Sequence, residues 1–371
     1  MIYLDNAATT PMTESVITAI NNYMMSSFGN PSSIHSYGRK AHKLLREARQ
    51  TIADLLGVAS RDLIFTAGGT ESDNAAIKGY ALAHQKQGRH LITTSIEHHA
   101  VLHTMAYLEE QFGFDITYLE PQKGTISVQQ VEEALRPDTI LVSMMAANNE
   151  TGDLLPIYEV GQLLKNHQAV FHVDAVQVIG KVKINLTDSG IDMLSASAHK
   201  FHGPKGVGFL YSHHLVWDPL LHGGDQEEKR RSGTENMIGI IGMAQALQDA
   251  YRQMEQNWEK VTALNSLLLD QLAGLPYYVN GSDKRLPHVL NLGFKGLVNG
   301  TILTQLDLAG IAISTGSACT AGTVDPSHVL AALYGPDSNR LRESIRISFS
   351  DLNTTKEVQI LAHELKKIVK G

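Results

Sequence analysis

The chain has 371 residues, of which 43% are hydrophobic and 19% charged, and its formal net charge is −7. These proportions are typical of globular proteins, no apolar run approaches the roughly eighteen residues of a transmembrane helix, and Asp5 lies where a signal peptide carries basic residues. We therefore expect a cytoplasmic protein that binds neither a membrane nor, given its acidic balance, nucleic acid directly.

The pattern of apolar residues predicts an α/β protein of two domains, because the chain is long for one compact core. A helix is expected over 39–56, and β-rich runs then alternate with helical stretches. The runs are 63–66, 91–95, 140–146, 170–173, 193–196 and 207–211, and the helical stretches are 71–85, 100–112, 128–135 and 156–166. This alternation predicts a mostly parallel sheet covered by helices, with an antiparallel edge at the last runs.

The C-terminal part predicts a smaller α+β domain. A long helix over 236–273, broken near Asn257, precedes a strand at 288–294, a helix at 301–309 and a strand at 344–350. Thr354 and Glu357 form a capping box at the start of a final amphipathic helix. We predict a large domain of residues 16–250 and a small domain of residues 1–15 and 251–371.

Residues 65–74 predict a phosphate-binding turn. The first β-rich run leads into Gly68 and Gly69, and we place the start of the next helix at Thr70, with Thr70 as N-cap and Asp73 completing a capping box. Glycines let the backbone approach an anion, and the free N–H groups at a helix start attract it. An ordinary strand–helix turn is the alternative.

Asp174 lies at the end of an apolar run. Ligands of open α/β sheets bind beyond the carboxyl ends of strands. A buried carboxylate at that place needs a partner, and a protonated pyridine nitrogen is a suitable one. The alternative is that Asp174 caps the following segment.

Lys200 follows Ser197 and His199 in a loop of small residues. Loss of hydration lowers the pKa of an amine and lets it bond covalently to an aldehyde. Ser197 and His199 are placed to share a phosphate with Thr70. A single lysine is more often surface charge, but the order of phosphate turn, aspartate and lysine favours a ligand site.

Cys319 is the only cysteine, so neither an internal disulfide nor a thiolate metal site is available. Residues 316–323 around it are all Gly, Ala, Ser or Thr, which predicts an accessible, mobile loop thiol that reacts. The alternative is the small buried hydrophobe that most free cysteines are. The 17 histidines form no HExxH pattern, and we predict no metal site.

These constellations resemble the group I, NifS/IscS-like cysteine desulfurases, which are fold type I enzymes of the class V aminotransferase family and depend on pyridoxal 5'-phosphate (PLP). The resemblance covers nearly the whole chain. It includes the motifs Leu4-Asp5-Asn6-Ala7-Ala8-Thr9, Phe28-Gly29-Asn30-Pro31-Ser32, Thr70-Glu71-Ser72-Asp73-Asn74, Glu97-His98, Asn148-Asn149-Glu150, His172-Val173-Asp174, Ser197-Ala198-His199-Lys200, Arg231-Ser232-Gly233-Thr234, Gly316-Ser317-Ala318-Cys319-Thr320 and Ser344-Ile345-Arg346-Ile347-Ser348.

The resemblance implies a chemistry and a role for each matching residue. L-cysteine becomes L-alanine, and its sulfur passes to Cys319 as a persulfide, then to an acceptor protein for iron–sulfur cluster assembly or tRNA thiolation. Lys200 matches the lysine that holds PLP, and His98 matches the residue stacked on its ring and a candidate proton shuttle. Asp174 matches the partner of the pyridine nitrogen, and Gln177 matches the residue that contacts the phenolic oxygen. The phosphate contacts are matched by Gly69, Thr70, Ser197 and His199, and the substrate contacts by Asn149 and Arg346. Thr234 matches a residue that reaches the phosphate of a second subunit, which implies a homodimer.

Two departures from the family pattern concern the sulfur acceptor. After Ile347-Ser348 the family often has Gly-Arg, whereas this chain has Phe349-Ser350-Asp351. After Cys319 the enzymes dedicated to iron–sulfur scaffolds often have Thr-Ser, whereas this chain has Thr320-Ala321-Gly322.

Another PLP enzyme of this fold, such as a selenocysteine lyase or an aminotransferase, is one rival function, although an aminotransferase gives no reason for a lone loop thiol. A catalytically idle sulfur-trafficking scaffold is the other, and the intact Lys200, Asp174 and His98 argue against it.

Overall fold

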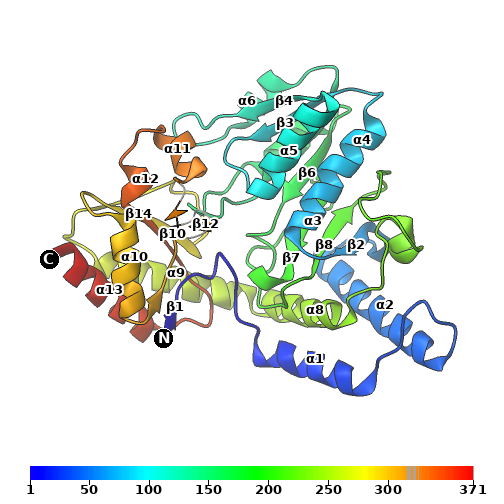
Figure 1. The fold of residues 1–371 in the computed structure, drawn as a ribbon, viewed down its shortest axis with the longest axis horizontal. Helices are drawn as coiled ribbons and strands as arrows, with labels where there is room; N and C mark the ends of the chain where they lie inside the picture. Colours follow the sequence, from blue (N-terminus) through cyan, green and yellow to red (C-terminus); the bar gives the residue numbers. More distant parts are fainter. Residues whose placement is uncertain (316–318, 321–322, 325, 371) are drawn as a thin grey trace.

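A computed structural model describes residues 1–315, 319–320, 323–324 and 326–370, and for residues 319–320 and 323–324 it describes the backbone. Two layered units lie side by side along the longest axis, and both termini lie at the smaller unit (Figure 1). The larger unit contains a seven-stranded sheet and the smaller one a three-stranded sheet. The fold is that of the α/β class predicted from the sequence.

The large sheet has the strand order β2-β8-β7-β6-β5-β3-β4. Neighbouring strands from β7 to β4 are parallel, whereas β8 is antiparallel to both β7 and β2. The strands are β2 (Leu63–Thr66), β3 (His90–Thr94), β4 (Asp115–Leu119), β5 (Thr139–Met145), β6 (Val170–Asp174), β7 (Met193–Ser197) and β8 (Gly208–Ser212).

The predicted β-rich runs are all strands of this sheet, with bounds that differ by no more than one residue at either end. Their side chains are buried on both faces, as parallel strands covered by helices require. The antiparallel pairing expected for the last two runs is confirmed for β7 and β8, although the edge strand is β2. The partly exposed β4 was not predicted.

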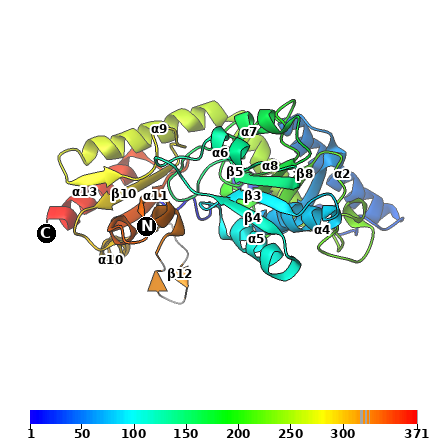
Figure 2. The same cartoon turned by 90° about the horizontal axis from the view of Figure 1, so that it is seen from above.

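Helices cover both faces of the large sheet (Figure 2). One face carries α1 (Glu14–Ser26), α2 (Ser36–Leu56), α6 (Val128–Ala134), α7 (Ile157–Leu164) and α8 (Met237–Arg252), which share a core with Phe171 and Phe209. The other face carries the helical run α3 (Gly69–Asn74), a π-helical segment (Ala75–Gly79) and α4 (Tyr80–His84), together with α5 (His99–Phe112). The sequence did not predict α1.

The smaller unit is built on the antiparallel sheet β14-β10-β9. Its elements are α9 (Met254–Gln271), β9 (Tyr277–Val279), β10 (Val289–Phe294), α10 (Asn299–Leu308), β11 (Ile311–Ala312), α11 (His328–Tyr334), α12 (Arg340–Glu343), β14 (Ser344–Ser348) and α13 (Thr355–Lys370). The N-terminal β1 (Ile2–Tyr3) pairs in parallel with β11, and Leu4 belongs to this unit's core. The first residues of the chain therefore lie against its last third.

Local sequence signals explain where two helices begin and end. The Glu357 N–H donates to Thr354 Oγ1 at 3.3 Å, and the Thr354 N–H donates to the Glu357 carboxylate at 2.8 Å, so the predicted capping box is confirmed. The break expected near Asn257 lies instead at Gln253, between α8 and α9. No helix among the described residues is long and apolar enough to cross a bilayer.

Adjacent residues of α13 provide a matched test of the smaller core. Leu361 is fully buried, whereas Ile360 is 38% exposed. We expect Leu361→Ala to lower the free energy of unfolding by about 2–5 kcal/mol, because it leaves a cavity, and Ile360→Ala to change it by no more than about 1 kcal/mol. Urea denaturation of the purified variants measures both. Equal losses would contradict this assignment of the helix face.

Candidate active site

A cavity of about 760 Å³ lies between the two units, at the carboxyl ends of β5, β6 and β7. This is the edge at which an open α/β sheet binds ligands. Residues of both units line the cavity, because Ser314, His328 and Arg346 come from the smaller one. The predicted site residues among the lining are Gly69, Thr70, His98, Asn149, Asp174, Gln177, Ser197, His199, Lys200 and Arg346.

The turn before α3 forms a cradle that only glycines fit. Gly68 has φ +149°, and a Cβ on Gly69 would lie 2.7 Å from Val176 Cγ2. The prediction that Thr70 is the N-cap is wrong, because α3 begins at Gly69 and its N-cap is Gly68. Thr70 is exposed on the first turn. The start of this helix faces the cavity with glycine backbone, which suits a phosphate.

Asp73 does not cap α3 and is buried beside Asp174. Its pKa is raised by loss of hydration and by the charge of Asp174, which itself has a pKa raised to about 6 by burial. The Val176 N–H donates to Asp174 Oδ1 at 2.9 Å, so the alternative role of local cap is also present. The sequence motif contained Asp73 but did not reveal this contact.

The Lys200 amine lies inside the cavity, held by main-chain carbonyls. Its Nζ donates to Ala7 O at 2.5 Å and to Ala8 O at 3.0 Å. Loss of hydration and then the charge of Arg346 lower its pKa to about 8, although Asp174 opposes the shift. A fraction of this amine is therefore neutral, and nucleophilic, near neutral pH.

His98 lines the cavity at the start of α5. The Ala100 N–H donates to its Nδ1 at 3.1 Å, so the neutral ring carries its proton on Nε2. Loss of hydration and the charge of Lys200 lower its pKa to about 4. The neighbouring Glu97 is fully buried and has its pKa raised to about 8 by burial. The sequence motif contained Glu97 but gave it no role. Its burial and raised pKa indicate a neutral carboxyl group next to His98 in the chain.

Arg346 is buried and oriented before any ligand binds. Its Nη2 donates to Asp5 Oδ1 at 2.7 Å, and its Nη1 donates to Asn149 O at 3.0 Å. Its Nε is buried without a partner among the described residues. The pairing with Asp5 joins residues 341 positions apart, so sequence patterns had no means to find it. A cation fixed in this way is suited to a planar carboxylate.

Cys319 lies in a short hairpin that projects from the smaller unit (Figure 2). Its strand β12 (Cys319–Thr320) pairs with β13 (Thr323–Val324), and its side chain lies outside the described residues. Both ends of the connecting chain are attached to the cavity wall. Ser314 exchanges main-chain hydrogen bonds with Arg346 at 3.1 and 2.6 Å, and His328 Nε2 lies 2.9 Å from Glu97 O.

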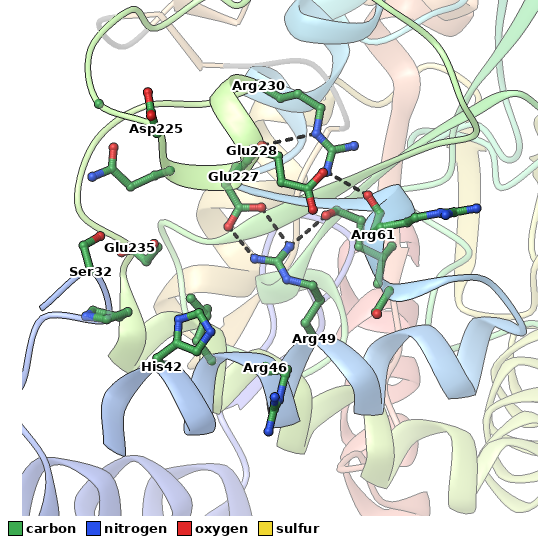
Figure 3. Close-up of a pocket in the computed structure, with 16 residues that line it drawn as sticks. Ser32, His42, Arg46, Arg49, Arg61, Asp225, Glu227, Glu228, Arg230 and Glu235 are labelled. Carbon is green, nitrogen blue, oxygen red and sulfur yellow. Dashed lines mark hydrogen bonds and ion pairs between the residues drawn. The ribbon is translucent and has the colours of Figure 1, made fainter. Parts of the chain in front are cut away.

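Thr234 is exposed and does not line the cavity of its own chain. The preceding segment is anchored by Glu227, whose carboxylate accepts two hydrogen bonds from Arg49 at 2.8 and 2.6 Å (Figure 3). Arg231 pairs with Glu71 on α3 at 2.9 Å. These buried contacts fix the segment beside the phosphate turn while Thr234 faces outward.

The residues that line the cavity fit PLP. The glycine cradle suits its phosphate, the Lys200 amine its aldehyde, and the buried Asp174 carboxylate its protonated ring nitrogen. Gln177 Oε1 is buried without a partner among the described residues, while its Nε2 donates to Ala7 O at 3.1 Å. An unpaired amide at this point is available for a further polar group of a ligand.

Comparisons with known proteins agree with this geometry. Residues 2–361 match the model of the aminotransferase class-V family. A protein of Bacillus subtilis (strain 168) called putative cysteine desulfurase IscS 1 is 52% identical, over 100% of this chain and 98% of its own length. The cysteine desulfurase IscS of Methanosarcina thermophila is 45% identical, over 99% of this chain and 92% of its own length.

Solved structures give the same result. A NifS-like protein superposes with a TM-score of 0.93 at 37% identity, covering 100% of this chain and 99% of its own. The structure called SspA in complex with cysteine has a TM-score of 0.85 at 37% identity, covering 95% of this chain and 100% of its own.

The lowered pKa of Lys200 predicts its reactivity in cofactor-free protein. Only the neutral amine attacks an aldehyde, so reductive methylation at Lys200 should rise with pH, with a midpoint near 8, and then level off. A free lysine has a pKa of about 10.4, and the exposed Lys123 serves as the internal control. Peptide mass spectrometry measures both sites. Parallel curves for the two lysines up to pH 10 would refute the shift.

Proposed function

The chain belongs to the aminotransferase class-V family and is a PLP-dependent cysteine desulfurase, and on this premise we propose how its own residues convert L-cysteine to L-alanine. One observation carries the proposal: Lys200, Asp174 and Arg346 line one cavity, and the chain that bears its only thiol is attached to the wall of that cavity. When bound, PLP supplies an electron sink for negative charge at the substrate α-carbon.

Lys200 holds the cofactor, and Asp174 keeps its ring nitrogen protonated. Ser197, His199 and the backbone at Gly69 and Thr70 bind the phosphate. His98 stacks on the ring, and Gln177 binds the phenolic oxygen. These roles are supported by the position of all these residues around a single cavity.

Arg346 and Asn149 bind the carboxylate of L-cysteine. Because Asp5 and the Asn149 carbonyl already orient the guanidinium, little side-chain entropy is lost when the substrate arrives. Lys200, once released, takes the proton from the α-carbon and returns one later, since an amine with a pKa near 8 is suited to both steps near neutrality. His98 lines the same cavity and is the candidate proton shuttle of the reaction.

The Cys319 thiolate attacks the substrate sulfur. A sulfur–sulfur bond forms, and the bond between the substrate Cβ and its sulfur breaks with its electron pair going to Cβ. Cβ takes up a proton, so L-alanine leaves and a persulfide remains on Cys319. An unperturbed thiol has a pKa of about 8.5, so a minority is ionised near neutral pH. The persulfide sulfur then passes to an acceptor protein, of iron–sulfur cluster assembly or of tRNA thiolation.

We expect Cys319→Ala to retain PLP and its absorbance, because no PLP-binding residue changes. Alanine production from L-cysteine should fall at least about a hundredfold, because the sulfur loses its acceptor. Amino-acid analysis and the visible spectrum measure the two effects. Alanine production at the parent rate would show that the thiol is not the nucleophile.

The enzyme acts as a homodimer whose sites are completed by Thr234 of the second subunit. Residues 24–37 expose a group of large apolar side chains, among them Met25 at 90%, Phe28 at 81% and Ile34 at 91%. The rings of Phe28 and Tyr37 lie 5.0 Å apart, so at least these two adjoin. Exposed apolar side chains gathered in one segment support burial in an interface, and Thr234 is exposed, as a shared residue requires.

Subunit exchange tests the shared site. Lys200→Ala and Thr234→Ala homodimers should each be impaired. In a heterodimer, one site combines the intact Lys200 of one chain with the intact Thr234 of the other, so full random mixing should restore about a quarter of the wild-type activity per chain. Alanine production after proven exchange gives the result. No recovery would place Thr234 in the site of its own chain.

A further inference from the structure

Three side chains lie close together at the strand ends opposite the active site, those of Asp62, His213 and His214. Asp62 precedes β2, and His213 and His214 follow β8. The two strands are antiparallel, with Leu63 paired to Tyr211 and Thr66 to Gly208. This register brings the three side chains together, and one ligand atom from each lies within 4.8 Å of the other two.

We propose that these three residues bind a divalent transition-metal ion of the Zn²⁺ class, which departs from the prediction of no metal site made from the sequence. Two imidazole nitrogens and one carboxylate oxygen are ligands that zinc prefers, whereas Ca²⁺ and Mg²⁺ favour sites made of oxygen. Three protein ligands leave the fourth tetrahedral position for water.

The distance between Asp62 and His213 fits ligands that share one ion. Asp62 Oδ2 lies 3.1 Å from His213 Nδ1. Zinc bonds of about 2.0–2.2 Å place neighbouring tetrahedral ligand atoms roughly 3.3 Å apart. The same distance also suits a direct hydrogen bond between the two side chains, which a bound ion would replace. His214 completes the set after a side-chain rotation, which its exposure permits.

The Asp62 carboxylate is buried, and its ion-pair partners are His213, which is charged only when protonated, and Arg61. Asp62 is 4% exposed, while the nearby Arg61 side chain is 66% exposed and its Nε lies 3.9 Å away. An ion pair with so exposed an arginine is weak. A metal ion would compensate the desolvated charge much more fully.

The backbone at His214 is unusual in a way that favours the site. Successive residues of a strand point to opposite faces, but His214 adopts the left-handed region with φ +54°. The rings of His213 and His214 consequently lie with centroids 4.3 Å apart. A non-glycine residue in this region is unfavourable, and metal coordination by the second imidazole supplies a reason for the turn.

The site is structural rather than catalytic. The active-site end of β8 is Gly208, which pairs with Ser197 of β7, whereas the histidines follow its other end. An ion there joins the start of β2 to the end of β8 without reaching the cavity. It should therefore raise the thermal midpoint of the protein and leave desulfurase turnover unchanged.

The test uses tag-free, PLP-loaded protein that carries Cys319→Ala, so that no thiol binds the metal. Calorimetric titration with ZnCl2 should give one ion per chain. His214→Asn, which keeps a residue that tolerates the left-handed region, should weaken binding at least about tenfold, as loss of even a supporting contact does. His363→Asn, at an exposed position on α13, is the matched control and should bind as the parent does.

Two further measurements keep the test independent of folding. Co²⁺ should give a d–d absorption band that His214→Asn abolishes while its circular dichroism spectrum is unchanged. Zn²⁺ should raise the thermal midpoint of the wild-type holoenzyme but not that of His214→Asn. Equal Zn²⁺ affinity in the parent and His214→Asn, or no binding at micromolar Zn²⁺, would overturn the proposal.

Discussion

Burial of the Asp174 carboxylate at the end of β6 is the constraint on which the rest of the active site depends. Three buried acids lie close together here, and burial together with the charge of Asp174 raises the pKa of both Asp73 and Glu97. Like charges in a low dielectric cannot all ionise. Glu97, with its pKa raised to about 8, is protonated at neutral pH, and Asp174, with a pKa of about 6, keeps the charge. The negative charge is thus placed where a cationic ring nitrogen would compensate it.

The positive groups of the site come from two different units. Lys200 follows β7 of the large sheet, and Arg346 lies on β14 of the small one. The Arg346 charge lowers the pKa of Lys200, so the cation proposed to bind the substrate also makes the amine more reactive. If the proposed roles hold, the position of the smaller unit against the larger affects both substrate binding and proton transfer.

The sequence predicted the strands of the large sheet well because buried parallel strands are continuous apolar runs. It missed β4, in which Ile116 and Leu119 alone are buried. It placed the N-cap at Thr70 because the sequence pattern does not show the positive φ of Gly68. Short motifs and their resemblance to a family named most of the proposed site residues, and ten of these line one cavity. Strand register, or pairing between residues far apart in the sequence, produces the contacts of Asp5 and Asp73 and the cluster at Asp62. The spacing of residues along the chain does not encode either. The roles of all the proposed site residues, Cys319 and Thr234 included, stay predictions.

The carbonyls that hold Lys200 belong to Ala7 and Ala8, and the N-terminal segment that contains them is itself held by residues 346 and 348. Leu4 O accepts from the Ser348 N–H at 2.7 Å, and Asp5 pairs with Arg346. During synthesis, residues 4–8 leave the ribosome long before their anchors at Arg346 and Ser348. The pocket therefore closes only after residue 348 has emerged, and the cofactor meets its finished site no earlier than that.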